Sequence, residues 1–189
     1  MKTAAVPQSA PQSVPRASAA AWGERVRALE AAYLRVQNER MQGLGLLHPA
    51  LQVQAIGFAP APEQSAVAEG VLLTPWFMSL VRLPLQAQSS QGRIGRRATH
   101  GFGAEAFEFL GTHLDGVGFH ESCALFSPMN GFDTQARALE TAHAVLQQLR
   151  TAVAQAAAGT GAAASGTVAA APMARRDFFR RPLGAGARS

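Results

Sequence analysis

The chain has 189 residues, which is enough for one domain with a hydrophobic core, and a formal net charge of +5. The charge is uneven, because residues 20–155 hold ten arginines and eleven acidic residues while both ends are basic. This near-neutral body lacks the basic stripe that a folded nucleic-acid-binding domain carries. A single cysteine, Cys123, excludes an internal disulfide and a cysteine cage for a metal.

Residues 1–20 are rich in Ala, Pro, Gln and Ser and predict a disordered arm, since no apolar face repeats along them. Prolines interrupt every apolar run, so the apolar core of a secretory signal peptide is missing. No stretch reaches the roughly 20 apolar residues that a membrane-spanning helix needs. The sequence therefore predicts a cytoplasmic protein without membrane insertion.

The first ordered element begins near Trp22 and has the apolar spacing of a helix. Its apolar positions are Val26, Leu29, Tyr33 and Val36. Gly43 and Gly45 follow, and glycine ends helices because it readily adopts the left-handed conformation. One helix is therefore expected before the glycines.

The middle of the chain predicts β-structure, since short apolar runs alternate with turn residues. The candidate strands are 52–58, 67–74, 76–83, 93–102, 106–114 and 118–126. Prolines at positions 60, 62, 75 and 84 mark turns or strand ends, because proline cannot donate a backbone hydrogen bond. Asp115-Gly116 is a hairpin signal between the last two candidates.

A second helix is expected after Asp133, whose carboxylate would cap the free N–H groups of the first turn. Its apolar face would consist of Ala136, Leu139, Ala142, Leu146, Leu149 and Val153. From Gly159 to Pro172 the composition is that of a flexible linker. Three parts result: a disordered arm (1–20), one folded domain (21–155), and a linker with a basic tail (156–189).

The predicted fold class is α+β: an antiparallel sheet of five to six strands, flanked by an N-terminal and a C-terminal helix. The simplest packing places both helices on one face of the sheet. The other face, or a groove beside it, would then be available to a partner.

The residues that could carry catalysis do not form a recognisable constellation. His120 and Cys123 are three apart on a candidate strand, so they point to opposite faces and form no dyad. A buried structural thiol is the favoured interpretation of Cys123, although His48, His100 or His113 could still approach it. Metal binding by His120, Glu121 and Cys123 lacks a paired ligand spacing. The carboxylates Glu105, Glu108 and Asp115 are interpreted as solvated charges. No catalytic, cofactor or metal site is predicted.

Two apolar segments are candidate binding surfaces. Thr74-Pro75-Trp76-Phe77-Met78 starts a candidate strand with large side chains at consecutive positions, so Trp76 and Met78 would face one way and Phe77 the other. Phe126-Ser127-Pro128-Met129 carries soft apolar groups at a strand end. Burial on both faces is an equal alternative. The hypothesis is a client-binding site of Trp76, Phe77, Met78, Ser127, Pro128 and Met129, with Trp76, Met78 and Met129 as its anchors.

The tail segment Ala174-Arg175-Arg176-Asp177-Phe178-Phe179-Arg180 nearly reproduces the twin-arginine export pattern Ser/Thr-Arg-Arg-x-Phe-Leu-Lys. Such a signal acts near an N-terminus with an apolar run behind it, so export of this chain by the motif is not expected. A solvated basic tail is the alternative interpretation.

Four segments together resemble the HybE family (HupJ/HoxT type) of NiFe-hydrogenase assembly chaperones. They are Leu47-His48-Pro49, Thr74 to Met78, Cys123 to Met129 and the tail Arg175 to Arg180. The similarity runs over residues 22–155 and the tail, and departs in the Ala-rich linker and in Phe179 at a usual leucine. It implies a non-enzymatic α+β protein that acts before export of an uptake hydrogenase. The implied partners are the small-subunit precursor with its twin-arginine leader, the large subunit and other maturation proteins.

Three further hypotheses follow. The tail could mimic the client's leader and occupy its binding groove, or it could contact the large subunit or another maturation factor. An RNA-associated or general interaction protein with basic ends, with binding that weakens steeply with salt, is the alternative function. A cysteine-dependent enzyme would instead have a rapidly alkylated Cys123.

Overall fold

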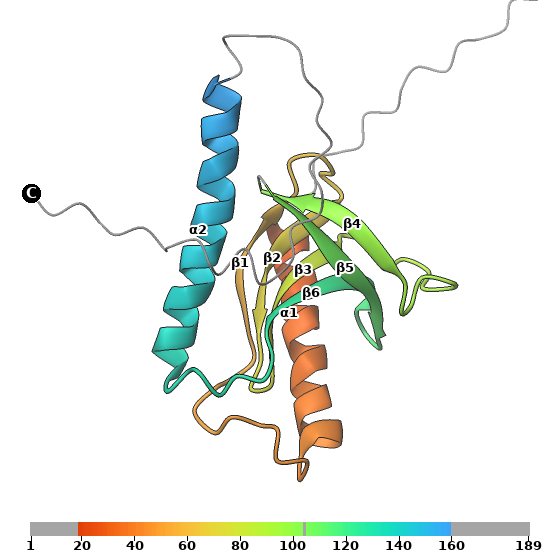
Figure 1. Ribbon diagram of the computed structural model, residues 1–189. Helices are drawn as coiled ribbons and strands as arrows, with labels where there is room; N and C mark the ends of the chain where they lie inside the picture. The colour runs from red at the N-terminus through yellow and green to blue at the C-terminus, as the bar shows by residue number, and fades with distance from the viewer. Residues whose placement is uncertain (1–18, 104, 160–189) are drawn as a thin grey trace, which may run out of the picture.

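The computed structural model describes residues 19–103 and 105–159, which form two helices and a six-stranded antiparallel sheet (Figure 1). Helix α1 (Ala19–Val36) continues into a short π-helical segment, η1 (Gln37–Met41). The strands are β1 (Gln54–Pro60), β2 (Val67–Leu73), β3 (Met78–Pro84), β4 (Arg97–Phe102), β5 (Glu105–Leu114) and β6 (Gly118–Phe126). Helix α2 (Gln135–Gly159) follows, and the strand order is β1-β2-β3-β6-β5-β4. The predicted fold class is confirmed.

The turn between β2 and β3 corrects one predicted boundary. The third strand begins at Met78 and not at Trp76, because the Thr74 hydroxyl organises residues 74–77 into a tight turn. Thr74 Oγ1 accepts hydrogen bonds from the N–H groups of Trp76 (3.3 Å) and Phe77 (2.9 Å), and the Phe77 carbonyl accepts from the Thr74 N–H (2.8 Å). Two-residue alternation therefore starts only after Phe77.

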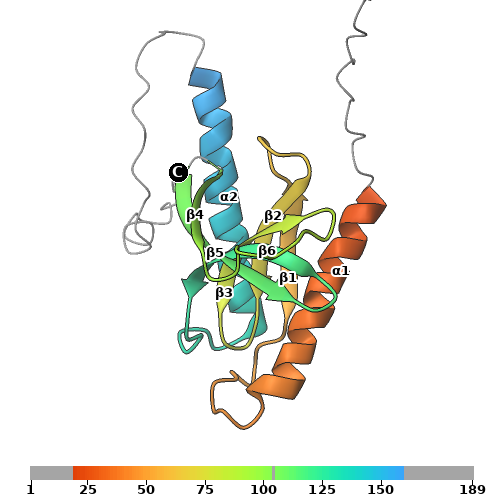
Figure 2. The same cartoon turned by 90° about the vertical axis from the view of Figure 1, so that its right-hand side faces the viewer.

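The two helices cover opposite faces of the sheet (Figures 1 and 2), so the prediction that both lie on one face is wrong. On one face, α1 buries Leu29, Ala32 and Tyr33 against Leu72 and Val81. On the other, α2 packs its apolar residues Ala138, Ala142, Val145, Leu146 and Leu149 against a cluster that includes Val71, Leu80 and Phe109. The physical reason lies in the central strands β2 and β3, which are buried at every position and therefore need a cover on each face.

The helix ends follow the predicted chemistry with one correction. Gly43 has φ +77° and follows the end of η1, as expected for a glycine that closes a helix. At the start of α2 the capping side chain belongs to Thr134 and not to Asp133. Thr134 Oγ1 accepts from the Arg137 N–H at 3.2 Å, and the Thr134 carbonyl accepts from the Ala138 N–H. The helix thus starts one residue later than predicted, and Asp133 and Ala136 are exposed.

Helix α2 is fixed to the edge of the sheet at Gly57. The Arg150 guanidinium donates to the carbonyl oxygens of Gly57 (2.6 Å) and Glu69 (3.2 Å). Gly57 has φ +61°, and a Cβ atom there would lie 2.6 Å from Leu146 Cδ1. Glycine is favoured at this position, because other residues are strained in the left-handed conformation and a side chain there would displace the end of Leu146.

Candidate functional site

Three segments that are distant in the sequence meet at one end of the sheet. They are the connection from η1 to β1, the β2–β3 turn, and the connection from β6 to α2, all at the lower end in Figure 1. The His48 N–H donates to the Pro75 carbonyl at 2.9 Å, and Met78 pairs with Phe126 across β3 and β6. We call this region the Trp76 end. It brings together all the segments of the folded part that resemble the HybE family.

Aromatic rings hold the turn of the Trp76 end in place. The Tyr33 ring from α1 lies 5.7 Å from the Phe77 ring and 6.5 Å from the Trp76 ring, between centroids. Trp76 and Phe77 pack edge to face at 5.6 Å, and both remain partly exposed. Ser127 and Pro128 on the neighbouring connection are exposed. The result is a preformed surface with two aromatic side chains of restricted mobility.

Two of the three predicted anchors, Met78 and Met129, are buried, so the prediction that they are exposed is wrong. Met78 is 0% exposed and Met129 is 1% exposed, and both belong to the core cluster under α2. Met78 is the first residue of β3 and points to the α2 face, whereas Trp76 and Phe77 lie in the turn and both join the cluster under α1. The turn breaks the alternation that would have put Trp76 beside Met78. The predicted residues with accessible surface are Trp76, Phe77, Ser127 and Pro128.

The connection before β1 adds apolar surface near the same end. Leu44 and Leu46 are 58% and 54% exposed, and they precede the His48–Pro75 contact. Exposed leucines are common on protein surfaces, and these two add apolar area beside the Trp76 end.

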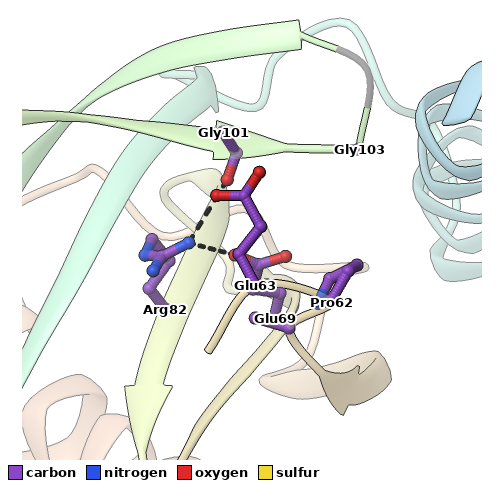
Figure 3. Close-up of a pocket in the computed structure, with 7 residues that line it drawn as sticks. Pro62, Glu63, Glu69, Arg82, Gly101 and Gly103 are labelled. Atoms are coloured by element: carbon purple, nitrogen blue, oxygen red, sulfur yellow. Dashed lines mark hydrogen bonds and ion pairs between the residues drawn. The ribbon is translucent and has the colours of Figure 1, made fainter. Parts of the chain in front are cut away.

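A second site lies toward the opposite ends of β2 and β3, on the α2 face of the sheet. Glu69, Arg82 and Glu121 are directly opposite one another across β2, β3 and β6. The Arg82 guanidinium donates to the Glu69 carboxylate, to the Gly101 carbonyl (3.2 Å) and to Gln64 Oε1 (3.1 Å), as Figure 3 shows in part. Its Nε atom is buried without a hydrogen bond, 3.8 Å from Glu121 Oε2.

Glu69 and Arg82 line a pocket, which we call the Arg82 pocket (Figure 3). Its lining residues are Ala61, Pro62, Glu63, Glu69, Arg82, Gly101 and Gly103. Burial raises the pKa of Glu69, Arg82 and Arg150 oppose that effect, and nearby Glu63 adds to it. On the other side of Arg82, Glu121 Oε1 lies 3.1 Å from His100 Nε2.

The sequence analysis missed the Arg82 pocket, although a signal was present. Glu69 lies between Ala68 and Gly70, and Arg82 lies between Val81 and Leu83, inside strands with apolar residues on both faces. A charge in such a strand needs a buried partner. The partner itself could not be identified, because it depends on the register between strands.

The predicted separation of His120 and Cys123 is confirmed. Cys123 is 4% exposed in the cluster under α2, whereas His120 is 0% exposed and bonds to Tyr33 of α1, on the other face. Of the remaining histidines considered, His100 pairs with Glu121, and His113 Nε2 lies 3.8 Å from Asp115. In residues 19–103 and 105–159, no group of three or more His, Cys, Asp or Glu side chains could hold a metal ion. No helix of this part is long and apolar enough to span a membrane.

The carboxylates Glu105, Glu108 and Asp115 lie apart from one another on β5 and the turn after it. Glu108 is exposed and pairs with Arg97, and Asp115 is 97% exposed in its side chain. These two are solvated charges, as predicted.

His120 connects α1 to the sheet through a defined tautomer. Its Nδ1 lies 3.2 Å from the Gly118 carbonyl, which only accepts, so Nδ1 carries the proton. Nε2 therefore accepts from the Tyr33 hydroxyl at 3.0 Å. Burial lowers the pKa of His120 to about 4, and His113 and Arg25 lower it further in smaller part, against the bond to Gly118.

This geometry predicts acid-sensitive stability. Between pH 6.5 and 4 the unfolded chain binds a proton at His120 that the folded chain does not, so stability falls as pH falls. From pH 7 to pH 5 we expect the free energy of unfolding to drop by about 2 kcal/mol through this residue. Urea denaturation at both pH values measures the change. A His120→Asn variant should lose that part of the pH dependence, and an equal slope in both proteins would contradict the assignment.

Residues 1–18 of the predicted arm and the twin-arginine-like tail, Arg175 to Arg180, lie outside the described residues. Helix α1 begins at Ala19, inside the predicted arm, and helix α2 extends to Gly159, past the predicted end of the domain at residue 155.

The two partly exposed aromatic side chains of the Trp76 end make it a candidate surface for contact with another polypeptide. Comparison with known proteins shows the family to which the chain belongs. The chain belongs to the HybE family of NiFe-hydrogenase assembly chaperones, described as NiFe-hydrogenase assembly, chaperone, HybE, whose sequence profile matches residues 24–181. The match includes Arg175 to Arg180. Membership in a chaperone family implies a non-enzymatic role.

Individual relatives agree with the family. Protein HoxT of Cupriavidus necator is 36% identical over 136 residues, which cover 67% of this chain and 76% of that protein. The hydrogenase expression/formation protein HoxT of Azotobacter vinelandii is 36% identical over 160 residues, 85% of this chain and 97% of that protein. The solution structure of HybE from Escherichia coli has the same fold, with a TM-score of 0.53, 21% identity, and coverage of 67% of this chain and 77% of that chain.

Proposed function

We propose that this protein binds subunits of a NiFe uptake hydrogenase in the cytoplasm before export, without catalysing a reaction. The proposed clients are the precursor of the small subunit, through its twin-arginine leader, and the large subunit. Other maturation proteins are further proposed partners. The proposal rests on membership in a family of hydrogenase assembly chaperones and on relatives named for hydrogenase expression and formation.

The observation that carries the proposal is the Trp76 end. The family-like segments of the folded domain converge there, and they present Trp76, Phe77, Ser127 and Pro128 at the surface. A few apolar anchors on a preformed surface are what docking of an unfolded segment requires. Leu44 and Leu46 would extend the contact.

Co-purification tests the proposed clients. The tagged full-length protein is expressed with the hydrogenase small subunit with its leader, the small subunit without its leader, or the large subunit. We expect capture of the leader-bearing precursor, and capture of the leaderless form to be at least tenfold weaker. Equal capture of both small-subunit forms would remove the leader as the recognised feature. Capture of neither subunit would refute the proposal, and recovery of RNA in a salt-sensitive manner would favour the RNA-associated alternative.

A further inference from the structure

Strand β4 ends the sheet, and only one of its two sides has a neighbouring strand (Figure 1). That neighbour is β5, and Phe102 of β4 is paired with it across a loop of two residues. The residues that flank such a loop form a hydrogen-bonded pair, and every second residue before them does the same. The residues between, Arg97, Thr99 and Gly101, therefore direct their N–H and C=O groups away from β5.

Most of these outward backbone groups are available to a ligand. The Gly101 carbonyl accepts a hydrogen bond from Arg82 at 3.2 Å, which agrees with its direction away from β5. No other outward group of the three residues has a partner among residues 19–103 and 105–159. All three residues are exposed, and a Cβ atom at Gly101 would meet nothing within 4 Å. Five groups remain: the N–H and C=O of Arg97 and of Thr99, and the N–H of Gly101.

The opposite edge of the sheet, formed by β1, is closed by side chains of both helices. Glu30 of α1 accepts from the Ala55 N–H at 2.7 Å, and Arg150 of α2 donates to the Gly57 carbonyl at 2.6 Å. Proteins cover sheet edges in this way because open backbone groups invite pairing with another chain. The two edges of this sheet differ, and β4 is the one that can accept a further strand.

The open groups of β4 specify the chemistry of their ligand. A row of alternating N–H and C=O groups is matched by another extended backbone. Arg96 and Arg97 are exposed at the start of the row. Arg97 pairs with Glu108, whereas Arg96 forms no ion pair with any residue that the structure describes. This positive charge favours a ligand with acidic side chains and disfavours a basic segment such as a twin-arginine motif.

Helix α2 limits the length of the open edge. A Cβ atom at Gly103 would lie 2.3 Å from the Leu149 carbonyl oxygen, so α2 borders the strand there and the open row ends at Gly101. We propose that β4 binds an extended acidic segment of a client polypeptide, which adds to the sheet as a seventh strand. The inference rests on the proposed function for the identity of the client, and it adds a contact outside the Trp76 end.

The substitution that tests the added strand is Thr99→Pro. Proline removes the outward N–H of residue 99 but leaves the bonds between β4 and β5 in place, and edge strands tolerate proline at such positions. Thr99→Val keeps the N–H and is the matched control. We expect Thr99→Pro to weaken capture of the hydrogenase subunits about tenfold, the effect of losing one hydrogen bond, and Thr99→Val to leave capture unchanged. Thermal melting followed by circular dichroism verifies that both full-length variants are folded.

The acidic character of the ligand has its own test. Arg96→Glu should weaken capture of the client, and the effect should shrink as salt concentration rises. Arg40→Glu, an exposed arginine of η1, is the matched control. Equal capture by the two variants would overturn the acidic character of the ligand.

Hydrogen exchange of the unsubstituted protein measures the same contact without any variant. The amides of Arg97, Thr99 and Gly101 should exchange rapidly in the free protein and at least tenfold more slowly with bound client. The amides of Ala98 and His100, already bonded to β5, should change little. The probes are the two hydrogenase subunits and reduced, carboxymethylated lactalbumin, an unfolded acidic chain unrelated to hydrogenases. NMR resolves the individual amides.

The outcomes separate this inference from the proposed function. Client capture that is insensitive to Thr99→Pro, with unchanged exchange at residue 99, overturns the inference and leaves the proposed function standing. Failed capture of both subunits beside protection of residue 99 by the lactalbumin probe refutes the proposed function and supports strand addition at β4. No protection by any of the probes overturns the inference. A dimer that Thr99→Pro dissociates, without protection by client, assigns the edge to a second copy and also overturns it.

Discussion

Replacing Arg82 with alanine is expected to lower the free energy of unfolding by about 3–5 kcal/mol, because the buried Glu69 carboxylate loses its cation. Arg82 is 7% exposed in its side chain and contacts Glu69, Gln64 and the Gly101 carbonyl. The last contact also joins β3 to β4, which is three strands away in the sheet order. The substitution should therefore loosen β4 and leave the buried Glu69 carboxylate without its cation. Chemical denaturation monitored by circular dichroism measures the loss.

The pH dependence of this variant distinguishes lost charge compensation from lost packing. Without Arg82, the folded-state pKa of Glu69 should rise further above its unfolded value, so the folded variant holds protons that its unfolded chain releases. Its stability should then fall as pH rises, and the deficit relative to the unsubstituted protein should narrow between pH 7 and pH 5. Arg97→Ala is the matched control, because Arg97 pairs with Glu108 at the surface and such pairs contribute at most about 1 kcal/mol. A stable Arg82→Ala variant would contradict the assignment.

The sequence was sufficient for the order and type of the elements. Apolar alternation, prolines and the Asp115-Gly116 signal locate six strands, because each depends on a local rule that tertiary contacts do not override here. The helical spacing of apolar residues likewise located α1 and α2. The predicted starts of β3 and α2 were wrong because side chains there bind backbone groups. The hydroxyls of Thr74 and Thr134 determine where these two elements begin.

The sequence contained a signal that both faces of the sheet are covered. Val71-Leu72-Leu73 and Leu80-Val81 leave no polar face, which is typical of strands covered on both sides. The burial of Met78 follows from the same fact, once Trp76 is placed in the turn. The burial of Met129 could not be predicted in this way. It lies in a connection without the apolar spacing of a helix or strand, and its burial depends on packing against the core under α2.

The candidate sites depend on register and contact, which one sequence does not reveal. Trp76, Ser127 and Pro128 were predicted to belong to one client-binding site, but the contact behind that grouping, the pairing of Met78 with Phe126, is visible only in the structure. The Glu69–Arg82–Glu121 row exists because three strands align at these positions. The two sites lie toward opposite ends of β3, and Trp76 and Phe77 join the cluster under α1 whereas Arg82 lies on the α2 face.

Replacing Trp76 with alanine is expected to weaken client binding by 2 kcal/mol or more, roughly 30-fold, because truncation of a tryptophan anchor in a desolvated contact costs about this much. The ring is held by Tyr33 and Phe77 before binding, so little ordering cost opposes its contribution. Calorimetric titration of the full-length variant with the small-subunit precursor, or with its leader peptide, measures the change.

Folding controls keep this result interpretable. Trp76 is partly buried, so the variant should unfold at a lower temperature yet remain folded at 25 °C, and Trp76→Phe should retain most of the packing around Tyr33. Trp22→Ala is the matched control, since Trp22 is the other tryptophan of the chain and lies in the first turn of α1, outside the Trp76 end. Its affinity for the client should be unchanged. If folded Trp76→Ala binds as tightly as Trp22→Ala, the client docks elsewhere, and the aromatic cluster serves only to fix α1 to the β2–β3 turn.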